Sequence, residues 1–206
     1  MIIGICGFIG CGKDTVADYL INEHGYTRDS FAGNLKDAVS VIFGWDREML
    51  EGRSTEAREW REQVDTWWAE KLSMPTLTPR WVLQYWGTEV ARKGFHDEIW
   101  IHSLERKLKN KSNVVITDCR FPNEVQSIKS QNGKIIWVQR GELPVWYDIA
   151  LDAVRGSKEA LSEINHLSIH ASEWSWLDTK FDAVIENNAS LAALYNNIEN
   201  FLKISN

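Results

Sequence analysis

A glycine-rich turn near the start of the chain constrains its fold more than any other feature. Residues 1–6 are apolar and fit a short buried strand, and residues 13–24 place apolar side chains at helical spacing before Gly25. The turn between them reads GFIGCGK and matches G-x-x-x-x-G-K, the pattern of a loop that surrounds phosphate groups. The order of strand, loop and helix therefore predicts an α/β protein with a phosphate site in this turn.

Each part of this turn has a chemical task in phosphate binding. Glycines allow backbone conformations in which successive N–H groups point at one phosphate, and the helix N-terminus adds partial positive charge. The ammonium of Lys13 can reach the outer phosphates of a nucleoside triphosphate and follow the charge during transfer. A purely structural turn is the alternative. The residues expected to bind ATP here are Gly7, Gly10, Cys11, Gly12, Lys13, Asp14 and Thr15.

Asp14 departs from the usual motif, which has serine or threonine after the lysine. Its carboxylate would repel a triphosphate unless Mg²⁺ or an arginine neutralises it. Asp14 either binds Mg²⁺, directly or through water, or holds a substrate hydroxyl or a cation; a plain helix N-cap is the structural alternative. Thr15 offers a hydroxyl to a phosphate or to the metal.

Strands alternate with helices along the rest of the chain, which predicts a parallel sheet with right-handed crossovers. The segments 113–117 (NVVIT), 134–139 (KIIWVQ) and 182–186 (DAVIE) are typical of buried strands. Helices are expected at 34–43, 55–72, 80–92, 98–109, about 122–131 and 190–203. Within the region 55–72, an apolar stripe that is typical of a core consists of Trp60, Val64, Trp67 and Trp68.

Asp118 and Arg120 follow the strand predicted at 113–117. Because ligands bind at the carboxyl ends of the strands in an open α/β sheet, Asp118 is placed to orient Mg²⁺ or its water shell. Arg120 is placed to grip a phosphate through two parallel hydrogen bonds. A local ion pair between the two side chains is the alternative.

Charge and hydropathy exclude two classes of protein. The net charge of −6 argues against a protein that binds nucleic-acid polymers, which would present a basic face. No apolar run approaches the roughly 18 residues of a membrane span, and no signal-peptide pattern is present. The three cysteines have no framework spacing, which indicates free thiols. A cytoplasmic protein that acts on small molecules is expected.

Further blocks follow the glycine-rich turn in a fixed order: SFAGNLKDAV, QYWGTEV, FHDEIWI, VVITDCRFPNEV and HASE. Together with GFIGCGKDT, this series resembles the deoxynucleoside monophosphate kinases of tailed bacteriophages, which are P-loop kinases. The aspartate of GKDT is itself a trait of that family. The resemblance implies a single P-loop kinase-like domain over 1–206, with a three-layer α/β fold and a parallel sheet. It also implies a helical acceptor-binding insertion at about 34–110 and a lid at about 140–180.

The resemblance further implies transfer of the γ-phosphoryl group of ATP to a deoxynucleoside monophosphate with Mg²⁺. The enzyme would be a monomer or homodimer. It would act in the cytoplasm, which is the cytoplasm of the host if the chain is phage-encoded. Gln84 would bond a base edge, and Trp86 or Trp100 would stack on it, although each tryptophan is more typical of a core. By position, the acceptor site would comprise Lys36, Arg80, Gln84, Trp86, Gly87, Thr88, Asp118 and Arg120.

Catalysis is expected from Lys13, Asp14, Arg120 and Arg140, with the metal at Asp14, Thr15 and Asp118. Arg155 and Lys158 are further candidates for lid cations, and Asn187 would lie near the adenine. The block that contains His170, Ser172 and Glu173 has no derived role, and a helix start is the plain interpretation.

Other functions fit the same motifs. A phosphomevalonate-kinase-like enzyme shares the GKD loop and the Asp-x-Arg strand end, and dephospho-coenzyme A kinase is a more distant candidate. A nucleotide-binding ATPase or switch without an acceptor is the alternative from a different class, and a structural protein with a vestigial loop is the third.

Overall fold

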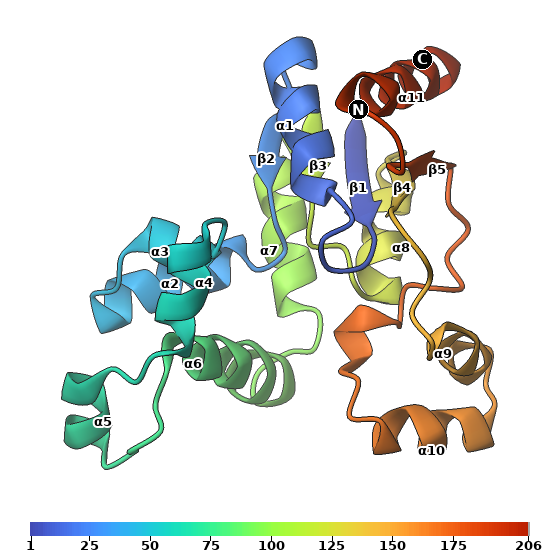
Figure 1. Cartoon of the computed structure of the whole chain (residues 1–206). Helices are drawn as coiled ribbons and strands as arrows, with labels where there is room; N and C mark the ends of the chain where they lie inside the picture. Colours follow the sequence, from blue (N-terminus) through green and yellow to red (C-terminus); the bar gives the residue numbers. More distant parts are fainter. Residues whose placement is uncertain (206) are drawn as a thin grey trace. The chain divides into compact units, whose positions relative to one another are not determined.

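The computed structural model describes residues 1–205 and divides them into two compact units (Figure 1). The first unit comprises Met1–Ser30 and the chain from Lys107 onward, and the second comprises Phe31–Arg106. None of the helices within residues 1–205 is long and apolar enough to cross a bilayer.

A five-stranded parallel sheet forms the first unit, with the strand order β2-β3-β1-β4-β5. The strands are β1 (Ile2–Cys6), β2 (Thr27–Asp29), β3 (Val114–Ile116), β4 (Lys134–Gln139) and β5 (Ala183–Glu186). β1 is central, because it pairs with β3 on one side and with β4 on the other. The turn that follows β1 therefore lies in the middle of the edge where ligands bind in such sheets.

Alternating side chains along β1 explain the layers of this unit. Ile3 and Ile5 belong to one buried cluster with apolar residues of α1 (Lys13–His24) and α11 (Leu191–Ser205). Gly4 faces the opposite layer, where a Cβ atom would lie 2.6 Å from Ile128 of α8 (Pro122–Ser130). Helices thus cover both faces of the sheet, and the predicted three-layer α/β fold with a parallel sheet is confirmed.

Two helices and a 3₁₀ turn separate β4 from β5: α9 (Tyr147–Val154), α10 (Lys158–His166) and η2 (Ala171–Glu173). An aromatic cluster fixes this segment to the sheet and to the glycine-rich turn. Phe8 lies in the turn, and its ring centroid is 5.5 Å from that of Trp146 and 5.1 Å from that of the fully buried Trp176. Trp176 also packs 5.6 Å from Trp137 of β4.

The second unit is helical and has its own core, formed by Leu35, Val39, Phe43, Trp45, Leu50, Ala69, Leu77 and Val82. The last residues of α7 belong to the first unit. The helices are α2 (Gly33–Phe43), α3 (Arg47–Glu51), α4 (Thr55–Glu62), α5 (Thr66–Leu72), α6 (Pro79–Tyr85), the π-helical stretch η1 (Trp86–Lys93) and α7 (Ile99–Leu108).

The prediction of one helix over 55–72 is wrong. α4 ends at Glu62, and Asp65 begins α5 as its N-cap, because the Asp65 carboxylate accepts the N–H of Trp68 at 3.0 Å. The predicted apolar stripe is divided accordingly. Val64 and Trp67 are exposed, whereas Trp60 and Trp68 pack against the core of the second unit.

The helix predicted over 80–92 also changes character part-way along. It is α-helical to Tyr85 and π-helical from Trp86. Gly87 lies buried in the wider turn, where a Cβ atom would come within 2.9 Å of Leu35. A larger residue would therefore push η1 away from α2.

A buried carboxylate joins the two points where the chain passes between the units. Asp29 precedes the first crossing and Lys107 follows the second, and their side chains pair at 3.2 Å; Lys111 adds a bond of 2.9 Å. Burial alone would raise the pKa of Asp29, but hydrogen bonds from Lys111, Ser30 and Lys107 outweigh it and hold that pKa below its ordinary value. The carboxylate is therefore ionised, and it holds the two passages of the chain together.

Candidate active site

The turn between β1 and α1 has a backbone that only glycine accommodates at two positions. Gly7 has φ 149° and Gly12 has φ 102°. A Cβ atom on Gly7 would lie 2.5 Å from the carbonyl oxygen of Val138, and one on Gly12 would lie 2.4 Å from Nδ2 of Asn187. The turn is thus packed against the neighbouring strand ends, in a conformation that larger residues cannot adopt.

Lys13 begins α1, and its side chain folds back over the turn. Its Nζ atom donates to the carbonyl oxygens of Gly7 at 2.7 Å and Phe8 at 2.9 Å. The ammonium and the N-terminal N–H groups of α1 therefore converge on the same turn. Such an arrangement binds anions, and phosphate groups in particular.

Asn187, directly after β5, stabilises this turn. The Asn187 side chain donates to the carbonyl oxygen of Cys11 at 2.9 Å, and its backbone N–H donates to Gln139 at 2.8 Å. Cys11 is almost fully buried. Burial raises the pKa of its thiol, and the charge of Lys13 offsets this only in part, so Cys11 stays protonated.

The structure places Arg28 of β2 at the predicted site, where it pairs with Asp14. The sequence did not predict this contact. The Arg28 guanidinium donates to the carboxylates of Asp14 at 2.6 Å and Asp18 at 2.7 Å. The arginine side chain is 14% exposed, whereas that of Asp14 is 69% exposed. An arginine thus neutralises Asp14, which is one of the two ways in which a triphosphate can be tolerated beside it.

Asp118 and Arg120 lie beyond the end of β3, the neighbour of β1, at the same edge of the sheet as the turn. The backbone N–H of Arg120 donates to the buried carboxylate of Glu124 at 2.7 Å, and its guanidinium donates to Glu173 of η2 at 2.7 Å. The other predicted residues of this unit are dispersed. Arg140 is exposed after β4, Lys158 is exposed in the first turn of α10, and Arg155 pairs with Asp178 at 3.0 Å.

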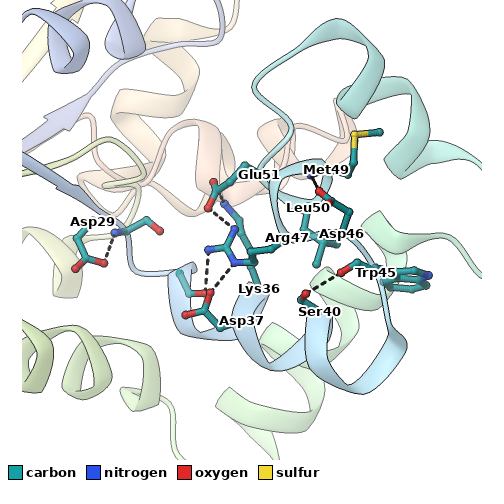
Figure 2. Close-up of polar contacts among 12 residues, drawn as sticks. Asp29, Lys36, Asp37, Ser40, Trp45, Asp46, Arg47, Met49, Leu50 and Glu51 are labelled. Atoms are coloured by element: carbon teal, nitrogen blue, oxygen red, sulfur yellow. Dashed lines mark hydrogen bonds and ion pairs between the residues drawn. The ribbon is translucent and has the colours of Figure 1, made fainter. Parts of the chain in front are cut away.

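In the second unit, Lys36 belongs to an ion-pair network of α2 and α3 (Figure 2). Its ammonium lies 2.7 Å from the carboxylate of Glu51, which also accepts from Arg47 at 2.6 Å. Arg47 pairs in turn with Asp37 at 2.6 Å. The two side chains of the Lys36–Glu51 pair are each 14% exposed, so the predicted acceptor cation is partly buried and neutralised by a carboxylate.

The remaining predicted acceptor residues lie on α6 and η1. Gln84 and Thr88 are exposed, and Arg80 forms a close ion pair with Glu62. Trp86 and Trp100 are half-buried against the core of the unit. The indole N–H of Trp100 donates to the carbonyl oxygen of Gly87, at 2.9 Å.

Sequence comparison matches the chain to viral enzymes. It is 31% identical over 211 residues to a protein of Acanthamoeba polyphaga mimivirus named as a deoxynucleotide monophosphate kinase, and the match covers 96% of this chain and 94% of that protein. The chain belongs to the deoxynucleoside monophosphate kinase family.

A second member of the deoxynucleoside monophosphate kinase family gives the same identity. The match to the deoxynucleoside-5'-monophosphate kinase of Escherichia phage T5 is 31% identical over 182 residues and covers 64% of this chain and 73% of that enzyme. A shikimate kinase from Aquifex aeolicus aligns over 98% of this chain and 96% of its own at 15% identity, with a TM-score of 0.47, which is too distant to bear on function. No protein-family model matches the chain.

For this deoxynucleoside monophosphate kinase family member, the Lys36–Glu51–Arg47 network predicts acid sensitivity. Burial alone would raise the pKa of Glu51, but Lys36 and Arg47 outweigh it and lower that pKa from 4.5 to about 2. The stabilisation, on the order of 3 kcal/mol, is present above pH 4.5 and is lost as the pH falls toward 2. We expect the difference in unfolding free energy between the wild type and Glu51→Gln, measured by urea denaturation, to shrink across this range. A difference independent of pH would contradict the shifted pKa.

Three residues of this family member's site were missed in the sequence: Arg28, Glu124 and Phe8. Arg28 lies in a strand of three residues without an apolar pattern. Glu124 had a usable signal, since it is the third residue of a helix that begins with Pro122, where a glutamate side chain turns back to the backbone. Phe8 carries no signal, because its partners come from a segment far along the chain.

Proposed function

We propose that the chain transfers the γ-phosphoryl group of ATP to a deoxynucleoside monophosphate, giving the diphosphate, with Mg²⁺. The observation that carries this proposal is the 31% identity to a viral deoxynucleotide monophosphate kinase over 96% of the chain. The turn between β1 and α1 supports it, because Lys13 and the helix N-terminus converge there as a polyphosphate requires.

In this proposal the protein contributes positioning and positive charge. The turn from Gly7 to Thr15 holds the triphosphate, Lys13 follows the moving charge, and Arg120 and Arg140 neutralise the transferred group. The acceptor phosphate is already ionised near neutral pH, so no general base is needed. We infer that Asn187 contributes to the ATP site by supporting the loop at Cys11.

Mg²⁺ would be held by Asp118, Thr15 and Asp14, and would supply neutralisation of phosphate charge. Carboxylate and hydroxyl oxygens are the ligands that this ion prefers. Within residues 1–205, no cluster of three or more His, Cys, Asp or Glu side chains is suited to hold a metal. Arg28 pairs with Asp14 at 2.6 Å. Of the three proposed ligands, the Asp14 carboxylate is therefore the least available to Mg²⁺.

We further infer that the segment at about 34–110 binds the acceptor, with Lys36, Arg80, Gln84, Trp86, Gly87 and Thr88 as its candidate residues. Asp118 and Arg120 of the first unit are separate candidates for contact with the acceptor. The segment at about 140–180 serves as the lid, with Arg155 and Lys158 as its cations. The enzyme acts on free nucleotides in the cytoplasm, that of the host if it is phage-encoded, as a monomer or homodimer.

A panel of acceptors tests the proposal. ADP formation from ATP and Mg²⁺ is measured with each deoxynucleoside monophosphate in turn, with phosphomevalonate, with dephospho-coenzyme A and with no acceptor. We expect turnover with at least one deoxynucleoside monophosphate and none with the other two compounds. ATP hydrolysis that no acceptor changes would identify a switch or ATPase instead.

The Asp14→Asn variant tests the metal site. If Asp14 contacts Mg²⁺ or its water shell, the Mg²⁺ concentration at half-maximal activity should rise by about tenfold, because one carboxylate contact is lost. Asp18→Asn is the matched control, since Asp18 accepts from the same arginine at 2.7 Å and is similarly exposed, at 64%. Equal Mg²⁺ titrations for the wild type and Asp14→Asn would reject the role of Asp14.

A further inference from the structure

Arg120 is held by a carboxylate from a distant part of the chain. Its Nη1 atom donates to Glu173 Oε1 at 2.7 Å and to Ser172 Oγ at 3.3 Å. The side chain of Glu173 is 24% exposed and that of Arg120 is 40% exposed, so the pair is only partly screened by solvent. Arg120 follows β3, whereas Glu173 ends η2, and the two residues are 53 positions apart.

The backbone of Arg120 is fixed independently of this pair. Glu124, which is 8% exposed, accepts the N–H of Arg120 at 2.7 Å and the N–H of Phe121 at 3.0 Å. These bonds anchor the start of α8 and leave the direction of the arginine side chain undetermined. The Glu173 contact supplies that direction.

The turn that carries Glu173 is itself anchored. The Nδ1 atom of His170 lies 2.8 Å from Ser172 Oγ and accepts the backbone N–H of Ser172 at 3.2 Å, which caps η2. Directly after the turn, Trp174 and Trp176 are buried, and Trp176 belongs to the aromatic cluster around Phe8. Glu173 therefore projects from a fixed support toward Arg120.

We infer that Glu173 is a positioning residue that orients the Arg120 guanidinium toward a substrate phosphate. Ser172 assists by accepting a second hydrogen bond from the same guanidinium. This positioning role rests on the proposed function, which gives Arg120 its phosphate contact. Guanidinium has five N–H donors in a rigid plane, so one edge can bond Glu173 while the other remains for a phosphate. A guanidinium that is already oriented loses less conformational freedom when the phosphate binds.

Steady-state kinetics of Glu173→Gln test the inference. With the acceptor found in the panel, kcat/KM should fall by about 10- to 100-fold, because the glutamine keeps the size but loses the charged acceptor. Glu173→Asp should recover part of the loss, and Ser172→Ala should cause a smaller loss in the same direction. Glu199→Gln is the matched control, since Glu199 pairs with His24 at 2.6 Å with a side chain 33% exposed, beside Met1 at the opposite edge of the sheet. It should change kcat/KM less than twofold.

The decisive comparison is made in an Arg120→Lys background. If Glu173 acts through the guanidinium, Glu173→Gln should add little to the loss that Arg120→Lys already causes. Equal losses in both backgrounds would overturn the inference, as would a Glu173→Gln variant with wild-type or higher kcat/KM. Thermal unfolding of each variant shows whether a loss of activity follows from a loss of fold.

A comparison of Arg120→Ala with Glu173→Gln distinguishes the positioning role of Glu173 from the proposed phosphate contact of Arg120. If Arg120→Ala is severely impaired while Glu173→Gln is normal, Arg120 keeps its role and only the positioning role of Glu173 is wrong. If Arg120→Ala turns over at a near-normal rate, the assignment of Arg120 to the phosphate is wrong, and the positioning role falls with it.

Discussion

Lys13→Ala should lower kcat by about 10²- to 10³-fold, as expected when one charged donor to a developing anion is removed. The Lys13 ammonium already lies over the loop, 2.7 Å from the carbonyl oxygen of Gly7. In the proposed function it is the only side chain of the turn that carries a positive charge to the γ-phosphate. The rate of ADP formation with a saturating acceptor measures the effect.

The loss must be separated from any effect on the loop itself, because Lys13 also bonds two carbonyl groups of the turn. Lys129→Ala is the matched control, since its ammonium likewise donates to a backbone carbonyl, that of Lys180, in the same unit. It should retain wild-type kcat. A Lys13→Ala enzyme within fivefold of the wild type would remove the turn from the mechanism.

Gly7→Ala should both destabilise the first unit and abolish nucleotide binding. The φ of 149° strains an alanine, and the new methyl group would lie 2.5 Å from a backbone oxygen of β4 that cannot move aside. Strain of about 1–3 kcal/mol corresponds to a fall in Tm of roughly 2–12 °C for a chain of this size. Differential scanning calorimetry and titration with an ATP analogue measure the two effects.

Gly25→Ala separates the effect of backbone strain from that of a steric clash. Gly25 has φ 66°, but a Cβ atom there would meet nothing within 4 Å. The cost should be about 1 kcal/mol, and nucleotide affinity should be unchanged. If Gly7→Ala were no more harmful than Gly25→Ala, the close packing of the turn against Val138 would not matter for binding.

The sheet and the loop could be predicted because their signals are local. β1, β4 and β5 are short apolar runs, and the glycine pattern fixes the turn that follows β1. The parallel order then places Asp118, Arg140 and Asn187 at one edge without further information. The roles assigned to these three residues stay predictions.

Local signals failed where the partner decides the structure. β2 is the three-residue segment Thr-Arg-Asp, and only its pairing with β3 makes it a strand. Arg28 could therefore not be placed beside Asp14. The break between α4 and α5 was missed for another reason: Asp65 lies within an otherwise helical pattern, and its capping role becomes visible only with the backbone turned away from the helix at Gln63.

Because the side chains of Asp29 and Lys107 pair at 3.2 Å, residues 31–106 leave the sheet unit and return to it at almost the same point. A replacement segment at this position needs only two ends that lie close together, and the strands on either side need no change. Such a junction allows the intervening helices to be exchanged as one unit while the nucleotide-binding turn between β1 and α1 is left unchanged.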